Sequence, residues 1–255
     1  MKRLFFRILI LCLLAGLTGC AGFRPETDPA LDKLARTRLT EIRSHNQEIA
    51  ASKGMARVRM EQKENRQSFT MAWAAQAPNQ ARIILTFSGQ PLETIIATGE
   101  KVQFRSHTGR HPLHTLNQAD PDMEQLLGIP IRLSEFVALL LGRVPIPEHD
   151  DVWFQGQSPD PTSAPICLRE NFTATHWTLT PDSQGRITRI QLKDADQKPL
   201  YTLERQAFRN VKTVSVPGRI LFTGNEGQRL EITLSRFLPN APVKESAFWL
   251  TPEGS

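Results

Sequence analysis

The sequence lacks both a strong excess of charge and a long flexible linker. Its 255 residues carry a formal net charge of +5, and three of the cations, Lys2, Arg3 and Arg7, lie at the amino end. The rest of the chain is therefore close to neutral, which argues against nucleic acid as a partner. No stretch rich in Gly, Ser or charge divides the chain, so we expect one large domain.

Cysteine is also scarce, with Cys12, Cys20 and Cys167 the only three. Cys12 lies inside an apolar leader and Cys20 at its end, which excludes a disulfide framework for the remainder of the chain. Cys167 stands alone in the apolar run 165–168 and is interpreted as a buried thiol, not a nucleophile.

The apolar leader has the features of a secretory signal. Residues 4–17 follow the amino-terminal cations and form a hydrophobic stretch that is short for a membrane span. The stretch ends in Leu17-Thr18-Gly19-Cys20, which resembles the bacterial lipobox, where cleavage precedes a cysteine that is then acylated. We expect a lipoprotein signal peptide at 1–19 and lipidation at Cys20, with firm attachment because more than one acyl chain is added. In such lipoproteins, Ala21 after the cysteine favours the outer membrane.

Residues 20–27 read as a lipidated tether, and 28–255 as the folded domain. Asp28 is a suitable helix N-cap, because Pro29 fits the first helical position. The residues that follow show helical spacing of apolar side chains over about four turns. These apolar positions are Leu31, Leu34, Ala35, Leu39 and Ile42.

From Gly54 onward the apolar period changes from that of a helix to that of a strand. Turn residues separate about eleven alternating segments, and 224–227 is the expected turn of a late hairpin. The segments fall between residues 56 and 105 and between residues 152 and 235. The intervening part predicts two short apolar helices. One is opened by Asp120-Pro121 and carries Met123, Leu126 and Leu127; the other begins at Ser134 and ends at Gly142.

The predicted fold is mainly β, an incomplete, half-open antiparallel β-barrel with three lid or plug helices. A twisted sheet of this size curls, and its apolar face must be covered. With so little helix available, the curl either encloses an apolar hollow or is filled by a packed core, and periodicity alone leaves both open.

Several short motifs, in this order and together with the lipobox, resemble the LolB outer-membrane lipoprotein receptors and related LolA-like lipoproteins. The resemblance spans most of the domain. It rests on residues 126–131, on 133–145, on 82–86 leading into a Pro-Leu turn, on 227–230 and on 248–254.

The resemblance implies a concave apolar surface that holds the acyl chains of another lipoprotein. It also implies a lipid anchor on the periplasmic face of the outer membrane, and a soluble LolA-like carrier as partner. The acyl-cavity candidates are Phe69, Met71, Trp73, Leu85, Ile96, Leu126, Leu127, Phe136 and Leu140. In the receptors, a leucine in a Pro-Leu-Gly turn helps insertion into the membrane. Here Gly89 precedes Pro91-Leu92 instead of following it, so Leu92 is either a membrane-probing tip or the first inward residue of the next strand.

Other residue clusters offer little for catalysis or metal binding. Gly109 and Pro112 interrupt the spacing of His107, His111 and His114, and no cysteine or carboxylate completes a metal site there. The sequence His149-Asp150-Asp151 has no serine in a nucleophile context to act on. We therefore expect neither an enzyme nor a cofactor. The alternative to a lipoprotein receptor is a structural or sensory lipoprotein that uses the same fold to bind lipid or a partner without transfer.

Overall fold

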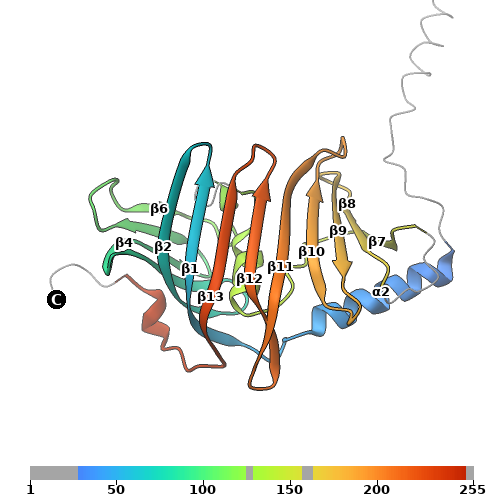
Figure 1. Ribbon diagram of the computed structural model, residues 1–255, viewed down its shortest axis with the longest axis horizontal. Coiled ribbons are helices and arrows are strands. Elements are labelled where there is room, and N and C mark those ends of the chain that lie inside the picture. Colours follow the sequence, from blue (N-terminus) through green and yellow to red (C-terminus); the bar gives the residue numbers. More distant parts are fainter. Residues whose placement is uncertain (1–27, 125–128, 157–162, 251–255) are drawn as a thin grey trace, which may run out of the picture.

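A computed structural model describes residues 28–124, 129–156 and 163–250. These residues form one antiparallel sheet of 13 strands in the order β6-β5-β4-β3-β2-β1-β13-β12-β11-β10-β9-β8-β7 (Figure 1). The described sheet is open, with β6 and β7 as its edges. The predicted half-open, mainly β fold is confirmed. The leader, the tether and Cys20 lie outside the described residues.

The strands are longest near the middle of the sheet and shortest at its edges. Their bounds are β1 Ala51–Gln62, β2 Asn65–Gln76, β3 Gln80–Phe87, β4 Gln90–Thr98, β5 Val102–Ser106, β6 His114–Leu116, β7 Asp151–Phe154, β8 Ile166–Glu170, β9 Thr175–Pro181, β10 Ile187–Lys193, β11 Pro199–Val211, β12 Val214–Gly224 and β13 Arg229–Pro239. The sheet thus has 13 strands where the sequence predicted about eleven, and β6 was missed because its three residues show no alternation.

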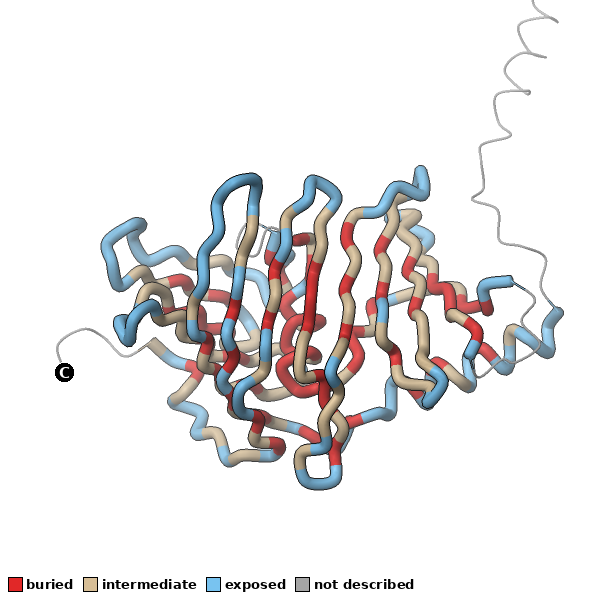
Figure 2. The backbone as a smooth tube through the Cα atoms, in the orientation of Figure 1, coloured by how far each residue is buried: buried red, intermediate tan, exposed pale blue. Residues whose placement is uncertain are grey.

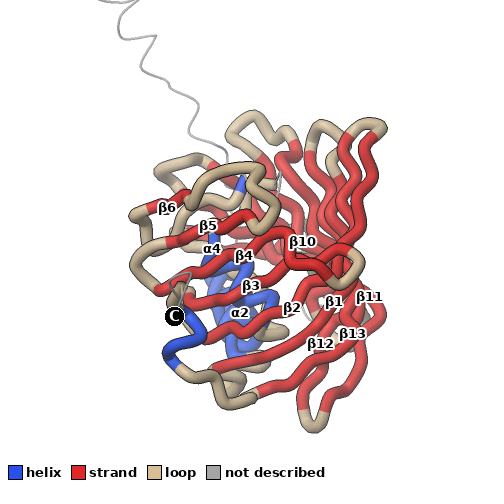
Figure 3. The backbone as a smooth tube through the Cα atoms, turned by 90° about the vertical axis from the view of Figure 1, so that its left-hand side faces the viewer, coloured by secondary structure: helices blue, strands red, loops and turns tan. Residues whose placement is uncertain are grey.

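Alternating side chains give the sheet a buried concave face. In β1, the buried residues Ala56 and Val58 alternate with the exposed residues Arg57 and Arg59. Figure 2 shows the same alternation of buried and exposed positions along the neighbouring strands. Seen from the side, the two α-helices lie inside the curve of the strands (Figure 3). The concave face is therefore where helix and sheet meet.

Helix α2 (Pro29–Ser44) begins as predicted. The Asp28 carboxylate accepts a hydrogen bond from the Ala30 amide at 2.8 Å, with Pro29 in the first turn. Ala35, Leu39 and Ile42 are buried, whereas Leu31 and Leu34 at the amino-terminal end keep 38% and 41% of their surface exposed. The predicted apolar stripe is therefore covered only along the later turns.

Helix α4 (Leu133–Leu140) has Arg132 as its N-cap residue, whereas the sequence predicted a start at Ser134. Asp120 accounts for the difference, because its carboxylate accepts hydrogen bonds from the Ser134 amide at 2.7 Å and from the Ser134 hydroxyl at 2.8 Å. The predicted helix after Asp120-Pro121 runs into residues 125–128, outside the described part of the chain. No helix in the described part is long and apolar enough to cross a bilayer.

A short 3-10 helix, η1 (Glu245–Phe248), packs against β3 and β4 near the end of the chain. Arg82 of β3 donates to the Ala247 and Trp249 carbonyls at 3.3 and 3.4 Å. Phe248 is 1% exposed yet is not part of the main buried cluster. Part of the convex face is therefore covered as well, which the sequence did not predict.

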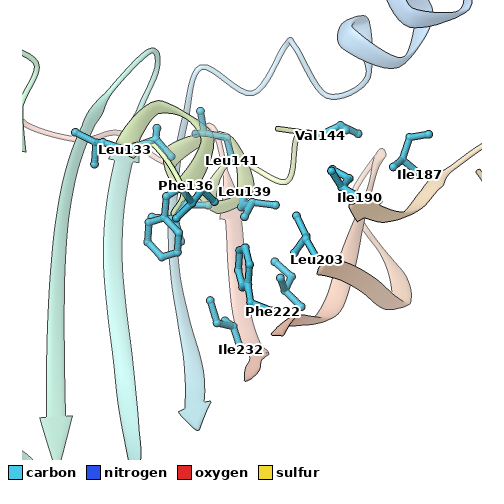
Figure 4. Packing of buried hydrophobic residues seen from close by; sticks show 14 of the residues in the cluster. Leu133, Phe136, Leu139, Leu141, Val144, Ile187, Ile190, Leu203, Phe222 and Ile232 are labelled. Atoms are coloured by element: carbon cyan, nitrogen blue, oxygen red, sulfur yellow. The ribbon is translucent and has the colours of Figure 1, made fainter. Parts of the chain in front are cut away.

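The half of the sheet that carries β9 to β12 is filled mainly by apolar side chains, together with the fully buried Arg205, which donates to the Ile187 carbonyl at 3.0 Å. Leu203 and Phe222 are cross-strand neighbours and both fully buried, and the Phe222 ring lies 6.1 Å from that of Tyr201. Figure 4 shows Leu203 and Phe222 beside Leu139, near the carboxyl end of α4. This half is a packed core.

Candidate functional site

The other half of the sheet encloses an apolar cavity of about 260 Å³ on the concave face. β1 to β4 and β13 form its floor, Phe136 of α4 faces it, and the loop between β5 and β6 contributes a polar rim. The cavity is lined by Val58, Met60, Phe69, Met71, Ile83, Leu85, Leu92, Glu93, Ile95, Thr108, Arg110, His111, Met123, Phe136, Leu230 and Ile232. A partly open space with mainly hydrocarbon walls suits an apolar ligand.

Strand register creates the floor. Val58 of β1 lies between Ile232 of β13 and Phe69 of β2, and Met71 of β2 pairs with Leu85 of β3. Side chains opposite each other across a ladder share one face of the sheet. The cross-strand rows therefore form a continuous apolar strip along the concave face.

An irregularity in β4 turns two consecutive side chains toward the cavity. Leu85 pairs with Glu93 and Thr86 pairs with Pro91, so Leu92 is the extra residue of a β-bulge. Leu92 and Glu93 both line the cavity as a result. Leu92 is therefore a wall residue, in agreement with the inward alternative, and Pro91 beside it is exposed.

The tip of this hairpin is formed by Ser88 and Gly89, whose φ angles of 49° and 81° give the tight reversal. Phe87, directly before the tip, keeps 57% of its surface exposed. The exposed apolar side chain at this turn is thus Phe87, and not the leucine of the Pro-Leu pair from which the sequence predicted a membrane-probing tip.

Helix α4 covers the cavity and is fixed at its carboxyl end. The Ser52 hydroxyl donates to the Leu140 carbonyl at 2.7 Å and accepts from the Trp73 indole at 3.1 Å. Asn46 also donates to the Gly142 carbonyl at 2.8 Å. These buried bonds tie the carboxyl end of α4, the lid over the cavity, to β1 and to the loop that follows α2. Each lost bond would leave a buried polar group unpaired.

The amino end of α4 carries a buried carboxylate. A Glu135 oxygen accepts a hydrogen bond from the Arg132 amide at 3.0 Å, closing the first turn. Burial raises the pKa of Glu135 to about 7, although the Arg132 amide and the Arg132 charge work in the opposite direction. The lid therefore contains a group that changes charge near neutral pH.

The polar rim contains a link between the β5–β6 loop and β4. The His111 ring contacts the Glu93 carboxylate at 3.1 Å through Nε2 and the Pro112 carbonyl at 2.8 Å through Nδ1. Both contacts raise the pKa of His111, the Pro112 carbonyl most, while partial burial lowers it. The link holds the loop against the cavity rim.

The predicted cavity residues fall into four groups. Phe69, Met71, Leu85 and Phe136 line the cavity, whereas Trp73 and Leu140 line a narrow crevice of about 20 Å³ beside it. Ile96 does not belong with them: Ile95 faces the cavity, and Ile96 lies on the opposite face of β4, paired in register with Arg82 under η1. Leu126 and Leu127 lie outside the described residues. The sequence could also have indicated Val58, Ile83 and Ile232 as cavity-lining residues, because they continue the same alternation.

The other singled-out residues lie apart and have structural contacts. His107 Nε2 lies 2.8 Å from the Thr94 hydroxyl, and the His114 ring stacks on Phe104 at 6.0 Å. The Asp150 carboxylate accepts a hydrogen bond from the Asn171 amide at 2.7 Å. Burial raises the pKa of the Cys167 thiol.

Among known proteins, no family model and no curated sequence matches this chain. Solved structures do match. A LolA superfamily protein from Nitrosomonas europaea has a TM-score of 0.60 at 11% identity, covering 85% of this chain and 97% of that one. A domain described as an outer membrane lipoprotein-sorting protein, from Vibrio parahaemolyticus, has a TM-score of 0.60 at 9% identity, with coverage of 85% and 97%. A DUF1329 family protein from Desulfovibrio piger has a TM-score of 0.56 at 9% identity, with coverage of 88% and 98%. At these identities the likeness concerns the fold, and the chain has the LolA/LolB-like open β-barrel fold.

Proposed function

We propose that this protein is a lipid-anchored lipoprotein that binds the acyl chains of other lipoproteins and helps to insert them into the outer membrane, in the manner of LolB. The observation that carries the proposal is the apolar cavity of about 260 Å³ between the curled sheet and α4. Hydrocarbon walls favour hydrocarbon ligands, because each methylene removed from water contributes about 0.8 kcal/mol. The lipobox-like Leu17-Thr18-Gly19-Cys20 supplies the anchor in this proposal.

Transfer in this scheme involves no covalent step. Cargo passes from a soluble LolA-like carrier to this protein and then to the bilayer, and each acceptor shields the acyl chains better than the one before. The hairpin tip beside the cavity is suited to the last step, because Phe87 is exposed there and Leu92 behind it lines the cavity. Insertion of this tip would bring the cavity wall close to the lipid.

A transfer assay tests the proposal. A Cys20→Ala variant of the full chain is mixed with a LolA-like carrier loaded with labelled lipoprotein, and the label is followed by separating the two proteins. Movement of the label to this protein is the expected result. If the label stays on the carrier while free fatty acid still binds, the receptor role is wrong, and the structural or sensory alternative takes its place.

The insertion step is tested by substituting the hairpin tip. Phe87→Asp should leave uptake of label from the carrier unchanged, since Phe87 is not among the cavity-lining residues, but it should slow delivery to vesicles. Phe172→Asp is the matched control, because Phe172 is 97% exposed at the β8–β9 turn of the other half of the sheet. Equal slowing by both variants would contradict a special role for the Phe87 tip.

A further inference from the structure

A second cavity, of about 300 Å³, adjoins the first on the side of the edge strand β6. Its walls are mainly apolar and come from β5, β6, the loop between them and the segment before α4. They are formed by Phe104, His111, Pro112, His114, Leu116, Asp122 and Met123. Two of these residues, His111 and Met123, also line the first cavity. The two cavities therefore share a wall made by these two side chains.

The two wall residues are held very differently. Met123 is 2% exposed, and its backbone amide donates to the Ile131 carbonyl at 2.9 Å, which fixes it to the segment before α4. His111 belongs to the β5–β6 loop, its side chain is 40% exposed, and it is held in place through its ring contacts with Glu93 and Pro112. Any opening between the cavities would therefore fall at His111.

The ring contacts of His111 also depend on its charge. The Pro112 carbonyl and the Glu93 carboxylate are both acceptors, so both ring nitrogens must carry hydrogen for both contacts to be hydrogen bonds. A neutral imidazole has one such hydrogen and would turn a lone pair toward one of the two oxygens. Loss of a proton, or of Glu93, would therefore release the ring from its place in the wall.

The volumes explain why a removable wall would matter. Ligand pockets commonly measure about 300–1,000 Å³. The first cavity is below that range and the second is at its lower limit, whereas the joined space falls within it. A single short acyl chain would suit one cavity, and a lipid with two chains would need both.

We infer that His111 is a removable partition, and that the second cavity receives the second hydrocarbon chain of a two-chain lipid whose first chain occupies the main cavity. This inference rests on the proposed acyl-binding function. Phe104, Leu116 and Met123 supply the hydrocarbon contacts for the second chain, and the partition swings outward with the exposed β5–β6 loop. The protein is then selective for two-chain lipids over one-chain lipids with the same headgroup.

The test compares two probes, short-chain phosphatidylglycerol and the matching lysophosphatidylglycerol, each competing with a fluorescent fatty acid for the Cys20→Ala protein. Leu116→Trp fills the second cavity alone, and Leu85→Trp is the matched control that fills the first. Leu116→Trp should weaken binding of the two-chain probe by about tenfold and leave binding of the one-chain probe unchanged, whereas Leu85→Trp should weaken binding of both. His111→Ala should strengthen binding of the two-chain probe only.

The inference is overturned if Leu116→Trp leaves binding of the two-chain probe unchanged, or weakens binding of both probes equally. Pro112→Trp tests the same cavity from an exposed loop position, so a misfolded Leu116 variant does not end the test. Failure of the unmodified protein to bind the one-chain probe or the fatty acid would instead contradict the acyl-binding function itself. The two failures are therefore distinguishable.

Discussion

The two halves of the sheet have the same alternating pattern but bury it in different ways. In the half with β9 to β12, Leu203 and Phe222 are fully buried in a packed core. In the half with β1 to β6, Phe69 and Leu85 face an open cavity and remain partly exposed. Alternation therefore determines which side chains face inward, whereas the segments that cover the sheet determine whether the inward space is filled.

Substitutions in the half with β9 to β12, called the filled half below, should have the largest effect on stability. Phe222→Ala removes a fully buried ring that lies 6.1 Å from Tyr201, so we expect a loss of about 3–5 kcal/mol in the free energy of unfolding. Chemical denaturation measures this loss. Phe172→Ala, at a side chain that is 97% exposed, should change the midpoint little. A similar loss for both variants would contradict the assignment of Phe222 to a packed core.

The next largest effect should come from α4, the lid over the half with β1 to β6, which is called the hollow half below. The folded state holds the Glu135 proton more tightly than the unfolded chain does, because burial raises its pKa from 4.5 to about 7. Stability should therefore fall as the pH rises from about 4.5 to about 7, by about 3 kcal/mol in total, and then level off. Glu135→Gln should stabilise the protein by that amount at pH 8 and by little at pH 4. Parallel pH profiles for the two proteins would show that Glu135 ionises normally.

Truncation of a wall residue in the hollow half should cost less stability than truncation in the filled half. Leu85→Ala enlarges a space that already exists, so we expect a loss below the about 2–5 kcal/mol that is usual for buried Leu→Ala changes. Leu203→Ala is the matched control in the filled half, since Leu203 is fully buried. Denaturation of both variants measures the contrast. Equal losses in the free energy of unfolding would mean that the hollow half is as well packed as the filled half.

The smallest expected effect concerns the polar rim. The Pro112 carbonyl and Glu93 raise the pKa of His111, so the rim link should persist at acidic pH and be lost as the pH rises through that pKa. His114 of β6, Arg110 in the same loop and Asp122 before α4 are the other charged or titratable groups around the rim. Glu93→Gln should lower the His111 pKa in an NMR titration of the ring. An unchanged pKa would show that Glu93 does not contribute to the link.

The strands and the first helix could be predicted because their signals are local. Alternation in β1 and β2 and the Asp28-Pro29 cap of α2 require no knowledge of distant residues. The start of α4 could not be placed correctly, because Asp120, which accepts the Ser134 hydrogen bonds, lies 14 residues earlier in the chain. Local sequence does not reveal such a partner.

Two features of β4 defeated the prediction of the site. Ile95, Ile96 and Ala97 are all buried, since η1 covers the outer face, so a period of two could not say which isoleucine faces the cavity. The bulge at Leu92 then shifted the alternation by one residue at the start of the strand. Wall residues on regular strands, such as Phe69 and Met71, were predictable because neither complication arises there.

The shortness of the edge strands has a consequence for how the protein behaves in a crowded compartment. An open sheet offers unpaired backbone groups at both edges, which invite other chains to add as further strands and so to polymerise. Here the edges are β6 with 3 residues and β7 with 4, whereas β1 and β2 in the middle have 12 each. So short a template gives an incoming strand few hydrogen bonds. The half-barrel can therefore keep its concave face open without serving as a seed for aggregation.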